Sequence, residues 1–138
     1  MKTIPLQKID LDANGVHLLV ESSIIEEGTY FIIDTGASKS VIDISLIENI
    51  PHTKIDSNEI KSSHISGMID GQIIELKKFP IDTHICLQFQ ALSMSLEHIN
   101  TLYEPFIDKK ISGLLGGDFF DKYNATINYK DYSMKGDF

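Results

Sequence analysis

The fold of this chain is decided by Phe31-Ile32-Ile33-Asp34-Thr35-Gly36-Ala37-Ser38. Its first three residues form an unbroken apolar run, which predicts a strand that is buried on both faces. A carboxylate follows at once, and small residues come next. Gly36 permits unusual backbone angles and the close approach of another chain, so we expect Asp34 to lie at the floor of a cleft. An ordinary turn at the end of a strand is the simpler alternative.

The composition predicts one mainly β domain. The 138 residues suit a single domain that spans 1–138, and the 22 Ile residues favour pleated, half-buried strands. A net charge of −8 disfavours binding to nucleic acid or to anionic membranes. The chain has no apolar run of the roughly 18 residues that span a bilayer, and its N-terminus lacks the apolar segment of a signal peptide. We therefore expect a soluble, cytoplasmic protein.

Apolar periodicity and turn residues predict the individual elements. Pro5 makes 3–9 an edge or terminal strand, and Asn14-Gly15 indicates the turn that follows it. The other segments expected as strands are 16–21, 29–33, a hairpin over 63–76, one or two strands over 81–95, and a final hairpin of 125–129 with 132–135. Short helices are expected over 41–50, 96–103 and 115–123, with a polar loop at 51–58. The whole predicts a closed, barrel-like β fold with one to three short helices.

A second motif, Leu114-Leu115-Gly116, stands far along the chain and is an apolar pair that ends in Gly. Together with Asp34-Thr35-Gly36-Ala37-Ser38, it makes the chain resemble the retropepsin family. These are the single-domain aspartic proteases of retroviral type and their cellular and bacterial relatives. The resemblance spans most of the chain in order, and it implies a closed, retropepsin-like acid-protease β-barrel in which each chain supplies one catalytic Asp.

The resemblance also implies roles for the residues of the two motifs. Asp34 would be catalytic, and Leu114-Leu115-Gly116 would pack beneath its loop as structural support. The remaining loop residues would support the two carboxylates or meet the substrate backbone. Thr35 would tie the two active-site loops of a dimer together, Gly36 would offer backbone contacts, and Ala37 and Ser38 would lie near the substrate.

A candidate flap lies between the two motifs. Gly67 and Gly71 would permit a mobile hairpin tip, and Met68 and Ile69 would close over the substrate and exclude water. The candidate residues are Ile65, Ser66, Gly67, Met68 and Ile69, with a tip centred on Asp70-Gly71 as a second possibility. An ordinary exposed hairpin is the alternative to a flap.

The count of catalytic motifs predicts a homodimer. The chain holds one Asp-[Ser/Thr]-Gly, at Asp34, whereas the chemistry requires two carboxylates. Two facing carboxylates cannot both ionise, so they share a proton and titrate as a unit. The ionised one takes a proton from the water that attacks the peptide carbonyl, and the protonated one stabilises the developing oxyanion. The second Asp34 should therefore come from a twofold-related partner, and no cofactor is needed.

Two places depart from the viral pattern. Ser38-Lys39 stands where the viral enzymes commonly carry acidic residues, and Gly117 follows Gly116 where they carry Arg. The intersubunit ion pairing of those residues is absent here, so we expect a differently built interface. In the viral enzymes the termini interleave as a sheet between subunits. Residues 1–6 and 132–138 are the segments available for this, although Gly136-Asp137 makes a poor strand.

The sequence leaves three hypotheses for function. The leading one is a homodimeric aspartic endopeptidase that hydrolyses peptide or protein substrates through Asp34. The first alternative is a retropepsin-fold module that binds peptides or proteins without cleaving them. The second is a small β-barrel whose Asp34 turn is accidental. Metal binding is not expected, because the five His residues are scattered without ligand spacing.

Overall fold

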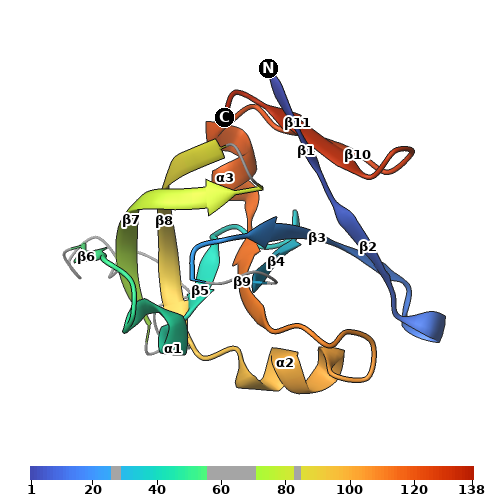
Figure 1. Cartoon of the computed structure of the whole chain (residues 1–138), viewed down its shortest axis with the longest axis horizontal. Coiled ribbons are helices and arrows are strands. Elements are labelled where there is room, and N and C mark those ends of the chain that lie inside the picture. The colour runs from blue at the N-terminus through green and yellow to red at the C-terminus, as the bar shows by residue number, and fades with distance from the viewer. Residues whose placement is uncertain (26–28, 56–70, 83–84) are drawn as a thin grey trace.

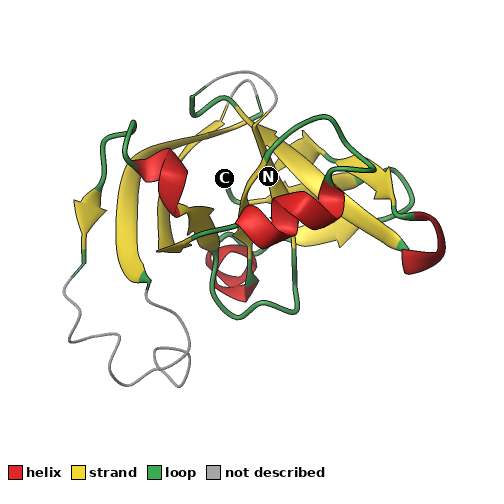
Figure 2. Ribbon diagram, turned by 90° about the horizontal axis from the view of Figure 1, so that it is seen from below, coloured by secondary structure: helices red, strands yellow, loops and turns green. Residues whose placement is uncertain are grey.

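The computed structural model describes residues 1–25, 29–55, 71–82 and 85–138, and this part of the chain is mainly β, as the sequence predicted (Figure 1). The strands are β1 (Lys2–Pro5), β2 (Gln7–Asp10), β3 (Val16–Ser22), β4 (Thr29–Ile33), β5 (Val41–Asp43), β6 (Thr53–Lys54), β7 (Gln72–Ile81), β8 (Ile85–Met94), β9 (Ile111–Leu115), β10 (Thr126–Asn128) and β11 (Ser133–Gly136). The helices are α1 (Ile44–Ile47), α2 (Glu97–Tyr103), α3 (Gly117–Lys122) and the 3-10 turn η1 (Asp12–Asn14). Figure 2 shows the helices as short segments between the strands.

The two ends of the chain form a small sheet of their own, in the order β1-β11-β10. The single strand predicted over 3–9 is wrong, because the chain divides at Leu6: β1 ends at Pro5, which pairs with Ser133, and β2 begins at Gln7 in the large sheet. β1 pairs antiparallel with β11, Lys2 opposite Gly136, so the two termini lie side by side (Figure 1). Gly136 does belong to a strand, because it pairs with Lys2. The Phe138 ring lies against it, and a Cβ at this position would lie 2.7 Å from that ring.

The large sheet has the strand order β2-β3-β4-β9-β5-β8-β7-β6. The predicted strands 16–21 and 29–33 are confirmed as β3 and β4. β4 also has the expected double burial, with Phe31 fully buried in one hydrophobic cluster and Ile32 buried in the other. Because β9 runs parallel to β4, with Ile33 opposite Leu115, the ends of both strands reach the same edge of the sheet.

The large sheet curls until β3 meets β7. Near the ends of these strands, the Asp82 amide donates to the Glu21 carbonyl at 3.0 Å, and the Ser22 hydroxyl donates to the Pro80 carbonyl at 2.5 Å. No ladder joins the two strands within the described residues, and β2 and β6 remain the outer strands of the sheet. The described residues therefore establish the mainly β class, and the closure of the barrel stays a prediction.

The segment 41–50 begins as a strand and not as the helix that its spacing predicted. Val41 pairs with Leu114 of β9 and with Leu92 of β8, so β5 fills the space between these strands. Its β-branched side chains favour this buried, extended position. The helix α1 starts only after Asp43, whose carboxylate accepts from the Ser45 amide at 3.2 Å and caps the helix.

The remaining predicted loops, hairpins and helices are confirmed fully or in part. Residues 51–58 are not all loop, because Thr53–Lys54 pairs with β7. The hairpin predicted over 63–76 is described only from Gly71 onward, where β7 runs to Ile81 and pairs with β8. The helix predicted over 96–103 is confirmed as α2, and the final hairpin as β10 and β11. The helix predicted over 115–123 begins only at Gly117, because Leu115 ends β9.

Two hydrophobic clusters fill the molecule. Phe31, Phe79 and Phe89 lie at the centre of the larger one, with ring centroids 4.3 to 6.0 Å apart in tilted and edge-on contacts. α3 and the terminal sheet add Phe119 and Met134 to this cluster. The smaller cluster lies against α2. No helix among the described residues is long and apolar enough to cross a bilayer.

Candidate active site

Asp34 directly follows β4 and is held by its own turn. Its backbone amide donates to the Leu115 carbonyl at 3.0 Å, which extends the parallel pairing of β4 and β9 by one residue. The Ala37 amide donates to the Asp34 carbonyl at 3.1 Å, and the Gly36 amide donates to Oδ1 of the carboxylate, also at 3.1 Å. The side chain is half-buried, so the carboxylate has a defined position and access to solvent.

The second motif lies against this turn. Leu115 is fully buried and pairs with Ile33, and Gly116 follows it beneath the loop. The Gly117 amide donates to the Ala37 carbonyl at 2.7 Å. A Cβ at Gly116 would lie 2.7 Å from that same carbonyl oxygen, so only Gly permits the approach. The two motifs are thus brought together across most of the sequence by the parallel pairing of β4 and β9.

The other residues predicted for the site lie at different depths. Thr35, Gly36 and Ser38 are exposed, and Ala37 is half-buried. These residues form a loop surface that is largely exposed to solvent. The flap candidates Ile65, Ser66, Gly67, Met68 and Ile69, together with Asp70, lie outside the described residues.

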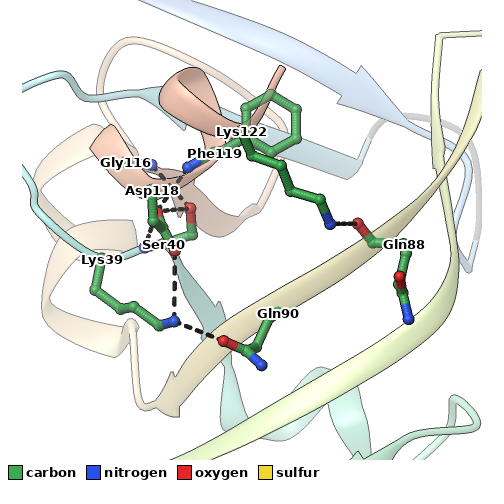
Figure 3. Close-up of polar contacts among 8 residues, drawn as sticks. All are labelled: Lys39, Ser40, Gln88, Gln90, Gly116, Asp118, Phe119 and Lys122. Atoms are coloured by element: carbon green, nitrogen blue, oxygen red, sulfur yellow. Dashed lines mark hydrogen bonds and ion pairs between the residues drawn. The ribbon is translucent and has the colours of Figure 1, made fainter. Parts of the chain in front are cut away.

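A polar network behind the loop was missed in the sequence (Figure 3). Ser40 is fully buried, and both its amide and its hydroxyl donate to Oδ1 of Asp118, at 2.8 and 2.7 Å. The Ser40 hydroxyl also accepts from the Gly116 amide at 2.9 Å. Lys39 Nζ lies 3.6 Å from Oδ2 of Asp118. The signal in the sequence was the placement of Asp118 at the start of a predicted helix, two residues after Gly116.

A polar cavity of about 340 Å³ lies beside this network. Lys39 and Asp118 form part of its wall, and Gln88 and Gln90 of β8 form another part. Lys39 Nζ also donates to Oε1 of Gln90 at 3.0 Å (Figure 3). Asp34 does not line this cavity. Among the described residues, no group of three or more His, Cys, Asp or Glu side chains has the arrangement of a metal site.

The structure thus places Asp34 at the end of a buried strand, in an Asp-Thr-Gly turn that rests on the apolar pair and Gly of the second motif. Residues 20–119 match the model of the aspartyl protease family, and the chain belongs to that family. The resemblance indicated by the two motifs is thereby confirmed.

The comparison with solved structures includes the crystal structure of a retropepsin-like aspartic protease from Rickettsia conorii. It shares 13% identity with this chain at a TM-score of 0.40, over 96% of this chain and 92% of the other. No curated protein matches the chain.

Proposed function

We propose that the protein is an aspartic endopeptidase that acts as a homodimer, with Asp34 of each protomer supplying one of two catalytic carboxylates. The observation that carries the proposal is the position of Asp34: a half-buried carboxylate at the end of a buried strand, with one oxygen held by the Gly36 amide. The family match supports the reaction class. The single Asp-Thr-Gly in the chain supports a twofold dimer, because one carboxylate cannot be both acid and base.

The proposed mechanism divides acid and base between the two carboxylates. One Asp34 is ionised and takes a proton from a bound water, which attacks the peptide carbonyl. The other is protonated and donates to the developing oxyanion. The Gly36 amide donates to Oδ1 of Asp34 at 3.1 Å and so holds that oxygen in place.

The surrounding residues have proposed roles in the same mechanism. Thr35 links the two loops across the dimer, and the exposed backbone at Gly36, Ala37 and Ser38 meets the substrate. Leu114-Leu115-Gly116 supports the loop, in keeping with the hydrogen bond from the Asp34 amide to Leu115. The segment 65–69 is the proposed flap, and its role follows from the family resemblance.

The barrel belongs to the same proposal. We infer that the curled sheet closes between β3 and β7 as a retropepsin-like barrel, supported by the hydrogen bonds Asp82–Glu21 and Ser22–Pro80. A closed barrel holds β4 and β9, and therefore Asp34, on a rigid frame.

Peptide cleavage tests the proposal. A diverse peptide pool is incubated with the parent protein and with Asp34→Asn, at acidic and at neutral pH. Asp34→Asn should keep the fold and the dimer but lose cleavage, because an amide cannot accept the proton from water. Asp121→Asn, an exposed position on α3, is the matched control and should cleave as the parent does. Equal cleavage by Asp34→Asn and the parent would overturn the assignment.

The alternative is a module of the same fold that binds peptides without cleaving them. It is favoured only by the departures from the viral pattern at Ser38-Lys39 and Gly117. Sedimentation across micromolar concentrations discriminates between the two, since a strict monomer cannot assemble two Asp34 carboxylates.

A further inference from the structure

The geometry points to Asp118 as a positioning residue that fixes the Asp34 loop to the start of α3 through Ser40. The expected effect of Asp118 on catalysis rests on the proposed function. The link between Asp118 and the loop rests only on the hydrogen bonds of its carboxylate. Asp118 accepts three hydrogen bonds at Oδ1: from the amide of Ser40, from its hydroxyl, and from the Phe119 amide at 2.9 Å (Figure 3).

Ser40 joins this carboxylate to the support of the loop. Its hydroxyl donates to Asp118 and accepts from the buried Gly116 amide, so it stands between the two motifs and α3. Its carbonyl accepts from the Leu92 amide of β8 at 2.9 Å. Ser40 is fully buried, so water cannot replace these contacts. Its position is therefore fixed from three sides.

The loop is clamped at both ends. At the front, the Asp34 amide is bound to Leu115, and at the rear the backbone of 37–40 is bound to 116–118. At the rear, the Gly117 amide donates to the Ala37 carbonyl, and the Asp118 amide donates to the Ser38 carbonyl at 3.2 Å. The Asp118 carboxylate accepts from the Ser40 amide. The exposed residues between these anchors include Thr35 and Gly36. Asp118 supplies the one acidic side chain in the rear clamp as the described residues show it.

The charge of the Asp118 carboxylate explains why Asp holds Ser40 more strongly than a neutral acceptor would. Hydrogen bonds to an ionised carboxylate are shorter and stronger than neutral ones. Lys39 Nζ faces the other oxygen at 3.6 Å, and both side chains are about a quarter exposed (28% and 27%), so solvent screens the ion pair. The hydrogen bonds to buried Ser40, and not the pair with Lys39, should carry the effect.

A simpler role is conceivable, in which Asp118 only caps α3 through the Phe119 amide. The two roles differ in whether Asp118 acts on the loop through Ser40 or independently of it. A cap acts on α3 alone, so the effects of Ser40→Ala and Asp118→Ala on the loop would be independent. A positioning residue acts through Ser40, so the two effects would overlap.

The test measures kcat and KM for a cleaved peptide in the parent, Asp118→Asn, Asp118→Ala, Ser40→Ala and the double Ala variant, all well below their unfolding temperatures. Misplacement of a catalytic group by about 1 Å costs on the order of 100-fold, so Asp118→Ala should lower kcat by about 10- to 100-fold with little change in KM. Asp118→Asn, which keeps an acceptor oxygen, should retain part of that rate. The double variant should lose less than the product of the two single losses, because the two substitutions remove one hydrogen bond in common, and Asp121→Asn should match the parent.

A second readout is independent of cleavage. Amide hydrogen exchange at Ala37 and Gly117 should become several-fold faster in Asp118→Ala, while exchange at Met134 in the terminal sheet stays unchanged. If Asp118→Ala does not fold, Asp118→Asn is judged by the same measurements, with smaller effects in the same direction.

The outcomes separate this inference from the proposed function. If the parent does not cleave, the proposed function fails, and amide exchange alone decides the role of Asp118. Unchanged exchange at Ala37 and Gly117 overturns the positioning role whatever the activity. In a cleaving parent, a kcat within twofold of the parent, or losses that simply multiply in the double variant, also overturn it.

Discussion

Gly116→Ala should displace the candidate catalytic loop by steric contact alone. A Cβ at this position would lie 2.7 Å from the Ala37 carbonyl oxygen, 2.9 Å from the Lys39 carbonyl carbon and 3.0 Å from the Lys39 oxygen. All three atoms belong to the backbone, so no side-chain rotation relieves the contact. The backbone of Gly116 is extended, with φ −105° and ψ −171°, and Ala adopts these angles without strain. The substitution therefore isolates the close approach.

The expected cost follows from the displacement. The contact with Ala37 must lengthen by roughly 0.7 Å to reach the 3.4 Å of ordinary van der Waals contact. Overpacking of this kind costs about 1–3 kcal/mol, and weakening of the Gly117–Ala37 hydrogen bond adds about 1 kcal/mol. Replacing Gly by Ala also lowers the conformational entropy of the unfolded chain, which stabilises the folded state by about 0.4–1 kcal/mol. The net loss in the free energy of unfolding should be about 1–4 kcal/mol.

Urea denaturation followed by circular dichroism measures this loss, with Gly117→Ala as the matched control. At Gly117 a Cβ would lie 3.6 Å from the Ala37 oxygen, an ordinary contact, and Ala is favoured over Gly in a helix. The control should be within about 0.5 kcal/mol of the parent or slightly more stable. If Gly116→Ala is as stable as the parent, or if both variants lose the same free energy, the close approach does not hold the loop as described.

Three further substitutions test the frame around the site. Phe79→Ala should lower the free energy of unfolding by about 3–5 kcal/mol, because Phe79 is fully buried against Phe31 and Phe89; a loss under 1 kcal/mol in urea denaturation would contradict that packing. Asn100→Ala should cost about 2 kcal/mol in the same assay, since the Asn100 side chain donates to the Ile111 carbonyl at 2.9 Å and accepts from its amide at 2.7 Å; a neutral result would show that α2 is held by other contacts. Burial, and then the charges of Glu21 and Asp108, raise the pKa of the Tyr30 phenol above its ordinary value of 10.0, so the folded state keeps this proton when the unfolded state has lost it. The parent should therefore lose stability as the pH rises above about 10, and Tyr30→Phe should lose less; identical urea midpoints for the two proteins at every pH from 8 to 11 would refute this.

The sequence by itself determined what depends on local patterns. The apolar run Phe31-Ile32-Ile33 specified a strand buried on both faces, and the Asp34-Thr35-Gly36 turn after it marked the candidate catalytic carboxylate. The spacing of the second motif at Leu114-Leu115-Gly116 indicated the family. These features lie within a few consecutive residues, where side-chain periodicity and turn preference act directly.

Tertiary structure decided what depends on distant partners. Ile42, Leu46 and Ile50 have a spacing that fits a helix, but β8 and β9 leave a place for a strand at 41–43, and burial there outweighs local preference. The split of the first strand at Leu6 likewise depends on β11, more than a hundred positions away, which supplies the pairing for β1. The Ser40–Asp118 link also depends on distant partners. The sequence places Asp118 near the start of a helix but does not show its partner, and the pairing of β9 with β4 and β5 brings its carboxylate to 2.8 Å from the Ser40 amide.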